Sequence, residues 1–168
     1  MNGLKILFFL FIVAGFSGCK IGYSFTGADI PEQAKSVSVG MFVSNAALAS
    51  PNLPLKITEK LKDQILAQTK LFIVSSSGDL QFTGTITGYD IKPMAVQANE
   101  TAGLNRLTIS VQAIYTNKYD DKKSYTQTFS RFADYDSAKE LSSVEDQLMD
   151  EINKQLVQDI FDKAFSNW

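Results

Sequence analysis

The sequence predicts an α+β fold in which two helices pack on one face of a mostly antiparallel sheet, in the order β-α-β-β-β-β-α. Two amphipathic helical stretches, at about 54–69 and 143–165, bracket a long run in which apolar and polar residues alternate. Alternation turns successive side chains to opposite faces of a strand, so the helices are expected to cover one sheet face. The other face is rich in Thr, Ser and Gln, and we expect it to be solvated or to meet a partner.

The first strand is expected at about 36–43. Val37, Val39 and Met41 alternate there with Ser38, Gly40 and Phe42. A loop is expected over 44–54, because this stretch holds Asn, Ser and two prolines. A helix follows at about 54–69, with an apolar stripe formed by Ile57, Leu61 and Ile65 and widened by Leu66.

The middle of the chain predicts a meander of strands. Leu71–Val74 is expected as a short buried strand, and the turn 75–79 leads to a strand that begins at Leu80 and that Pro93 closes. The apolar positions of this strand change face after Gly88, which indicates a β-bulge. The remaining expected elements are a loop over 94–103, a strand centred on 107–115, a polar loop over 117–123 and a strand at about 123–133.

The last helix is expected at about 143–165. Ser142 and Glu145 have the spacing of a capping box, in which each side chain binds a free amide of the first turn. The stripe that should face the sheet consists of Val144, Leu148, Ile152, Leu156, Ile160 and Ala164, widened by Met149, Val157, Phe161 and Phe165.

The composition excludes several function classes. The 168 residues contain 16 Lys and Arg against 18 Asp and Glu, so no basic excess favours nucleic acid. The chain has no histidine and a single cysteine, which removes the commonest general base and metal ligand and any disulfide within the chain. We therefore expect no enzyme activity, no metal and no cofactor other than a covalent lipid.

The N-terminus predicts a lipoprotein. Lys5 precedes an apolar run, Ile6–Phe16, that is too short for a membrane span of about 20 residues. Small residues and then Cys19 follow this run, as in a lipobox, where the cysteine is acylated and becomes the first residue of the mature chain. The expected organisation is a signal peptide over 1–18, a lipidated anchor and extended lead over 19–35, and a single domain over 36–168.

Three basic residues are candidates for contact with a ligand or partner: Lys92, Arg106 and Arg131. Arginine binds phosphate or carboxylate with a rigid fork, so contact with lipid phosphate is one interpretation. The alternative for each arginine is a salt bridge with Asp134, Asp90 or Glu100. Asp136-Ser137-Ala138 is similar to a short bacterial O-glycosylation signal, and the alternative for Ser137 is an ordinary loop position.

The mature chain as a whole resembles the Bacteroidetes form of the LptE family of lipopolysaccharide-assembly lipoproteins. The stretches that carry the resemblance are CKIGYSFTGADIP, GDLQFTGTITGYDIKP, NETAGLNRLTISV, FSRFADY, SVEDQL and QLVQDIFDKAFSNW. The resemblance implies two helices on a four-stranded sheet and a non-enzymatic role as plug and assembly partner of an LptD-type outer-membrane β-barrel. It also implies participation in lipopolysaccharide transport, and of the family's functional residues it carries over only the lipidated Cys19.

Lys20 follows the cysteine in place of an acidic residue, which favours the outer membrane, with the domain facing the periplasm or inside a barrel lumen. Two other functions stay open from the sequence. One is a periplasm-facing lipoprotein that serves another envelope or secretion machine. The other is a lipid-binding carrier, which would need a sizeable apolar cavity.

Overall fold

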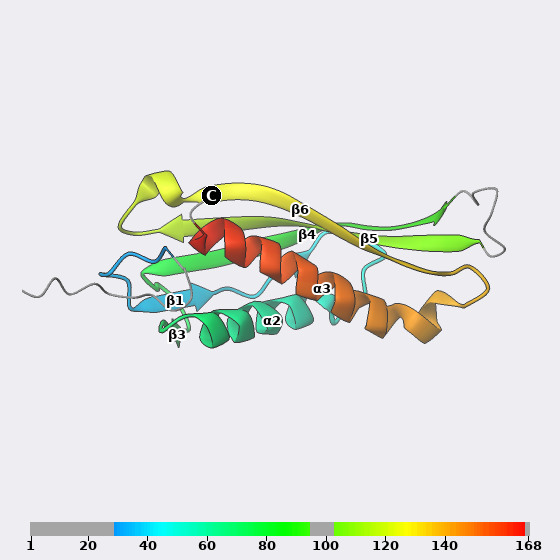
Figure 1. The fold of residues 1–168 in the computed structure, drawn as a ribbon, viewed down its shortest axis with the longest axis horizontal. Coiled ribbons are helices and arrows are strands. Elements are labelled where there is room, and N and C mark those ends of the chain that lie inside the picture. Colours follow the sequence, from blue (N-terminus) through cyan, green and yellow to red (C-terminus); the bar gives the residue numbers. More distant parts are fainter. Residues whose placement is uncertain (1–28, 95–102, 167–168) are drawn as a thin grey trace, which may run out of the picture.

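Two long strands form the centre of the sheet: β4 (Leu80–Met94) and β5 (Leu104–Asn117), which pair antiparallel along almost their full length (Figure 1). The computed structural model describes residues 29–94 and 103–166. β6 (Tyr125–Asp136) pairs antiparallel with the far side of β5, after a short 3₁₀ turn, η1 (Asp121–Lys123).

Three short strands complete the sheet on the other side of β4. β1 (Ser36–Val39) runs parallel to both β4 and β3 (Phe72–Val74), and β2 (Val43–Ser44) pairs parallel with β4 further along. The strand order is β3-β1-β4-β5-β6, with β2 paired to β4 outside this order, so β3 and β6 are the two ends of the order. The predicted α+β class and element order are confirmed.

Both helices, α2 (Leu53–Gln68) and α3 (Leu141–Phe165), cover the same face of the sheet. Figure 1 shows α3 crossing obliquely over the strands, with α2 beside it. Lys56 pairs with Asp146, and Lys60 pairs with Asp150, so the two helices run in the same direction. No helix of the described residues is long and apolar enough to cross a membrane.

The core lies between the helices and the inward side chains of the sheet. Alternate residues of β4 and β5, such as Leu80, Phe82, Ile109 and Val111, are almost fully buried. The α3 stripe predicted from its spacing is buried from Leu148 to Phe165, which confirms that interpretation. Phe82, Tyr115 and Phe165 form an aromatic cluster, with ring centroids 4.8–6.0 Å apart.

The first strand differs from its prediction, because Met41 and Phe42 exchange places. Met41 is 56% exposed and Phe42 is buried. The Phe42 ring fills the space beside Gly84 of β4, where any Cβ would collide with it. The inward turn of Phe42 divides the predicted 36–43 strand into β1 and β2.

The predicted capping box of the last helix is wrong. α3 begins at Leu141, with Glu140 as its N-cap residue and no side-chain cap, so Ser142 already lies inside the helix. The Glu145 carboxylate instead accepts a 2.5 Å hydrogen bond from the Tyr89 hydroxyl. Burial, together with this hydrogen bond, raises the pKa of Tyr89 well above its ordinary value.

Two apolar positions are less buried than predicted, because their elements lie at the margin of the domain. Phe72 is 71% exposed since β3 is an edge strand, and Leu66 is 54% exposed on the outer side of α2. The bulge predicted at Gly88 is confirmed by a shift of register between Ile86 and Gly88. β6 continues three residues beyond its predicted end at 133 and closes at Asp136.

Candidate functional site

The face of the sheet opposite the helices is a broad polar surface. We call it the open face, and it consists of the outward side chains of β4, β5 and β6. No helix of the described chain covers it, whereas most inward side chains of the same strands are buried. The register aligns its side chains in rows across the three strands: Thr83–Ile114–Thr126, Thr85–Gln112–Thr128, Gly88–Ser110–Ser130, Asp90–Thr108–Phe132 and Lys92–Arg106–Asp134.

Most open-face side chains carry a hydroxyl or an amide and no charge. The hydroxyls of Ser110 and Ser130 lie 3.0 Å apart across β5 and β6, and the Thr87 hydroxyl donates to the Ser110 carbonyl. Side chains of this kind can donate and accept hydrogen bonds in several directions, so they suit a polar partner surface or water.

The charged end of the open face holds two of the three predicted contact residues. Arg106 donates from Nε and a terminal nitrogen to both Asp134 oxygens, at 2.7 and 2.8 Å, so Asp134 is its salt-bridge partner. The guanidinium carbon lies 3.5 Å from the centroid of the Phe132 ring, which is 47% exposed. The hydrogen bond from Arg106 holds the pKa of Asp134 below its ordinary value, and the same bond raises the pKa of Arg106.

Lys92 is the register partner of Arg106 on β4 and is exposed. Its amine forms no ion pair or hydrogen bond with residues 29–94 or 103–166. Because Asp134 neutralises Arg106, Lys92 is, among the described residues at this end, the cation without an ion-pair partner. The structure therefore brings Lys92 and Arg106 together, as a cation beside a stacked, ion-paired arginine.

Arg131 lies on the opposite face of the sheet, among the helix-side residues of β6. Its Nε and a terminal nitrogen donate to both oxygens of Asp159 in α3, each at 2.6 Å. This partner is none of the three acids considered from the sequence. The alternation contained the signal for the placement, since Arg131 has the same parity as the buried Phe129 and Ala133. Arg131 and Arg106 thus belong to different surfaces.

An open hollow of about 500 Å³ lies between β6 and α3. Six side chains that end in charged or amide groups line it: Arg131, Glu151, Lys154, Gln155, Gln158 and Asp159. A site for an acyl chain is an enclosed cavity with apolar side chains, so this open hollow gives no support to the lipid-carrier alternative. In the part of the chain that the structure describes, no three acidic or cysteine side chains converge as metal ligands.

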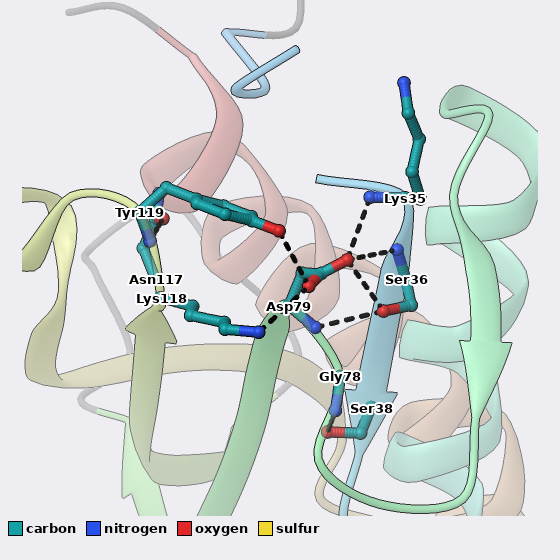
Figure 2. Close-up of polar contacts among 8 residues, drawn as sticks. All are labelled: Lys35, Ser36, Ser38, Gly78, Asp79, Asn117, Lys118 and Tyr119. Atoms are coloured by element: carbon teal, nitrogen blue, oxygen red, sulfur yellow. Dashed lines mark hydrogen bonds and ion pairs between the residues drawn. The ribbon is translucent and has the colours of Figure 1, made fainter. Parts of the chain in front are cut away.

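A polar cluster around Asp79, which no motif in the sequence indicates, holds the other end of the sheet together (Figure 2). The Asp79 carboxylate accepts hydrogen bonds from the backbone N–H groups of Lys35 and Ser36, and from the hydroxyls of Ser36 and Tyr119. Lys118 adds an ion pair at 3.8 Å. Hydrogen bonding, first of all from the Lys35 N–H, holds the pKa of Asp79 well below its ordinary value. The cluster joins β1, the turn before β4 and the loop after β5.

The turn before β4 has no room for a side chain at Gly78, the residue directly before Asp79. A Cβ at Gly78 would lie 2.5 Å from the Ser38 backbone nitrogen, so β1 passes directly against the turn. Figure 2 shows Lys35 and Ser36 on one side of Asp79 and Lys118 and Tyr119 on the other. The hydrogen-bond and ion-pair partners of Asp79 all belong to this chain, so we interpret the cluster as a stabilising contact between three segments and not as a ligand site.

Cys19 and the predicted signal peptide 1–18 lie outside the described residues, and so do most of the predicted loop 94–103 and the greater part of the lead 19–35. The described chain begins at Asp29, whose N–H donates to the Phe165 carbonyl and whose carboxylate pairs with Lys123 at 2.6 Å. Ser137 is exposed in the turn between β6 and α3, where its N–H donates to the Gly103 carbonyl.

Comparison with known proteins identifies a family. The family model described as LptE, lipopolysaccharide-assembly, matches residues 34–164, which is most of the chain. Among curated proteins, none matches.

Solved structures share the fold at low sequence identity. A hypothetical protein from Chlamydia trachomatis has a TM-score of 0.51 at 10% identity, over 78% of this chain and 98% of that one. A putative neuraminyllactose-binding hemagglutinin homolog from Helicobacter pylori has a TM-score of 0.51 at 8% identity, over 82% and 86% of the two chains. A protein from Xanthomonas campestris has a TM-score of 0.50 at 10% identity, over 81% and 91%. At such identities the likeness concerns the fold alone.

Proposed function

Because this chain belongs to the LptE family of lipopolysaccharide-assembly proteins, we propose that it is an outer-membrane lipoprotein that plugs an LptD-type β-barrel and assists lipopolysaccharide transport to the outer leaflet. Its role is that of a scaffold and plug without catalysis. The anchor is lipid on Cys19, and two or more acyl chains are enough for stable membrane attachment.

The open face is the observation that carries the plug proposal. A barrel lumen is lined by polar side chains, and a domain that fills it must present polar, largely uncharged surface. The rows from Thr83 to Ser130 on β4, β5 and β6 do so over a flat area of three long strands. An apolar face would have to be covered by lipid or by a second sheet. A highly charged face would lose the hydration of its charges when the domain enters the barrel, which costs free energy.

Tethering supports the same role through concentration. A domain held at the membrane by its N-terminal lipid meets a barrel in that membrane at a high effective concentration, so moderate contacts are enough for lasting association. The described domain begins only ten residues after Cys19, which keeps it close to the membrane surface.

Lipopolysaccharide contact, if direct, belongs at the charged end of the open face. Lys92 is exposed and free of a protein partner among residues 29–94 and 103–166, and it stands beside Arg106 on the neighbouring strand. A lysine of this kind binds phosphate as a point charge. The residues of that contact are thus Lys92 first and Arg106 second, whereas Arg131 contributes nothing to this face.

Purification of a tagged, lipidated chain from detergent-solubilised outer membranes tests the plug proposal. We expect a large β-barrel in near-equal amount, and a much smaller amount with Cys19→Ala, since this variant loses the tether. If no barrel is recovered under mild detergent from wild type, the plug proposal fails.

Lipopolysaccharide contact has its own test. Lys92→Gln/Arg106→Gln is expected to reduce the lipopolysaccharide that copurifies with the chain. Its matched control is Lys70→Gln/Lys122→Gln, which removes the same charge from exposed sites away from this face. Equal lipopolysaccharide recovery with both double variants would contradict the proposed contact at this end of the open face.

A further inference from the structure

The outer edge of β6 is a long row of unpaired backbone groups. β6 spans 12 residues at one end of the strand order, and its inner edge pairs with β5. Within the described chain no further strand pairs with its outer edge. Alternate N–H and C=O groups along that edge therefore face outward and offer a template for another extended strand.

This edge lacks the usual devices that prevent strand addition. The opposite edge, β3, is only three residues long, whereas β6 is four times as long. β6 contains no proline, and its register with β5 runs from Tyr125 to Asp136 without a bulge. The charged side chain that points to the helix side, Arg131, is neutralised by Asp159. Long edges left unprotected in this way are pairing sites.

The surroundings of the edge leave room for the side chains of an added strand. The hollow is lined by Arg131 of β6 and by five residues of α3, so it lies on the helix side of the sheet, beside the edge strand. Glu151, Lys154 and two glutamines line it and can receive polar side chains. On the open face the exposed Phe132 ring offers an apolar contact at the same edge.

We propose that the outer edge of β6 pairs with an extended segment of the barrel partner, which adds a strand to the sheet. This inference rests on the proposed function for the identity of the partner. The segment that fits alternates in character: polar side chains enter the hollow beside Glu151 and Lys154, and an apolar side chain lies against Phe132. Main-chain hydrogen bonds supply the affinity, and the two flanking sites supply the specificity.

Charge argues against a second copy of this chain as the occupant. Pairing of two β6 edges brings the two α3 helices toward each other, because α3 flanks this edge. α3 contains six Asp and Glu residues and two Lys residues, so the approach joins like charges. A neutral or basic segment meets no such repulsion.

Photo-crosslinking locates the occupant. A benzoylphenylalanine replaces Gln127, Ser130 or Phe132 of β6 in the lipidated chain, and the same replacement at Leu66, which is 54% exposed on the outer side of α2, serves as the matched control. The proposal expects crosslinks from the β6 positions to the copurified barrel at more than about tenfold the yield of the control. If the barrel copurifies but the β6 positions crosslink no better than Leu66, the edge proposal is overturned and the plug function stands. If no barrel copurifies, both fail, and a crosslinked dimer overturns the edge proposal in favour of a second copy.

Proline substitution tests the backbone bonds themselves. Gln127 and Thr128 are both exposed neighbours, and in an antiparallel strand one of their N–H groups faces β5 while the other faces outward. The melting temperatures of Gln127→Pro and Thr128→Pro are compared first. Proline at the residue whose N–H faces β5 breaks a hydrogen bond of the sheet, so the variant with the higher melting temperature is the one that loses the outward N–H. We expect that variant to retain about tenfold less barrel, because it loses one main-chain hydrogen bond and gains a clash with the added strand. Wild-type barrel recovery with this variant contradicts the proposal.

Discussion

Asn153 in α3 is fully buried, and neither polar atom of its side chain has a hydrogen-bond partner. Along α3 it falls between Asp150, which pairs with Lys60 of α2, and Gln158, which is hydrogen-bonded to Gln64 of α2. A buried polar group without a partner costs about 1–3 kcal/mol. Leucine has a similar size and needs no hydrogen bond. Asn153→Leu is therefore expected to raise the free energy of unfolding by about 1–3 kcal/mol.

Urea denaturation of the purified chain, followed by circular dichroism, measures this change. For chains of about 150–250 residues, each kcal/mol corresponds to a shift of about 2–4 °C in melting temperature, so a thermal scan gives an independent value. The slope of the urea transition should stay unchanged, since the surface exposed on unfolding is the same. A lower midpoint for Asn153→Leu would show that the amide has a partner, such as a buried water, and would refute the reasoning.

Thr58 provides the matched control, because it is equally buried but satisfied. Its hydroxyl accepts from the Phe42 N–H at 3.0 Å and donates to the Pro54 carbonyl at 2.7 Å. Thr58→Val preserves the shape and leaves the Phe42 N–H without an acceptor, so it should destabilise the chain by about 1–3 kcal/mol. Opposite signs at the two sites are the expected result. If both variants changed the free energy of unfolding in the same direction, packing and not hydrogen bonding would determine the stability at both sites.

Three further predictions concern the sheet. Gly78→Ala should destabilise the chain by about 1–3 kcal/mol in urea, because its Cβ would lie 2.5 Å from the Ser38 nitrogen; an unchanged midpoint would show that the turn relaxes freely. The pKa of Asp79 is depressed in the fold, so its stabilisation is present above the ordinary carboxyl pKa of about 4 and is lost as the pH falls toward the folded pKa. Between pH 6 and pH 2, wild type should therefore lose more melting temperature than Asp79→Asn, and equal losses would contradict the cluster. Phe82→Ala should cost about 3–5 kcal/mol because its ring packs on Tyr115 and Phe165, and a loss below about 1 kcal/mol would contradict that packing.

Local periodicity was enough to predict most of the fold. The two-residue alternation at 107–115 and the i,i+4 stripe of α3 each follow from neighbours along the chain, and both are confirmed. The choice between Met41 and Phe42 depends instead on empty space beside Gly84, some 42 residues away on another strand. The alternation of residues around position 42 carries no information about this space on another strand.

The candidate site shows the same division. Lys92 and Arg106 share a face because their strands are aligned, and the hairpin that aligns them was predicted. The alternation of side chains along β6 is enough to place Arg131 on the helix side. Its partner Asp159 could not be predicted in this way, because the alternation along a strand does not say where α3 packs. The Asp79 cluster joins three segments far apart in the sequence, so it became visible only in the fold.

The most direct test of the central claim is depletion of this protein in the bacterium that encodes it, followed by measurement of lipopolysaccharide on the outer leaflet. The account predicts that surface lipopolysaccharide falls while lipopolysaccharide accumulates inside the outer membrane, and that re-expressed wild type restores it while Cys19→Ala restores it poorly. Unchanged surface lipopolysaccharide after full depletion would contradict a role in lipopolysaccharide assembly.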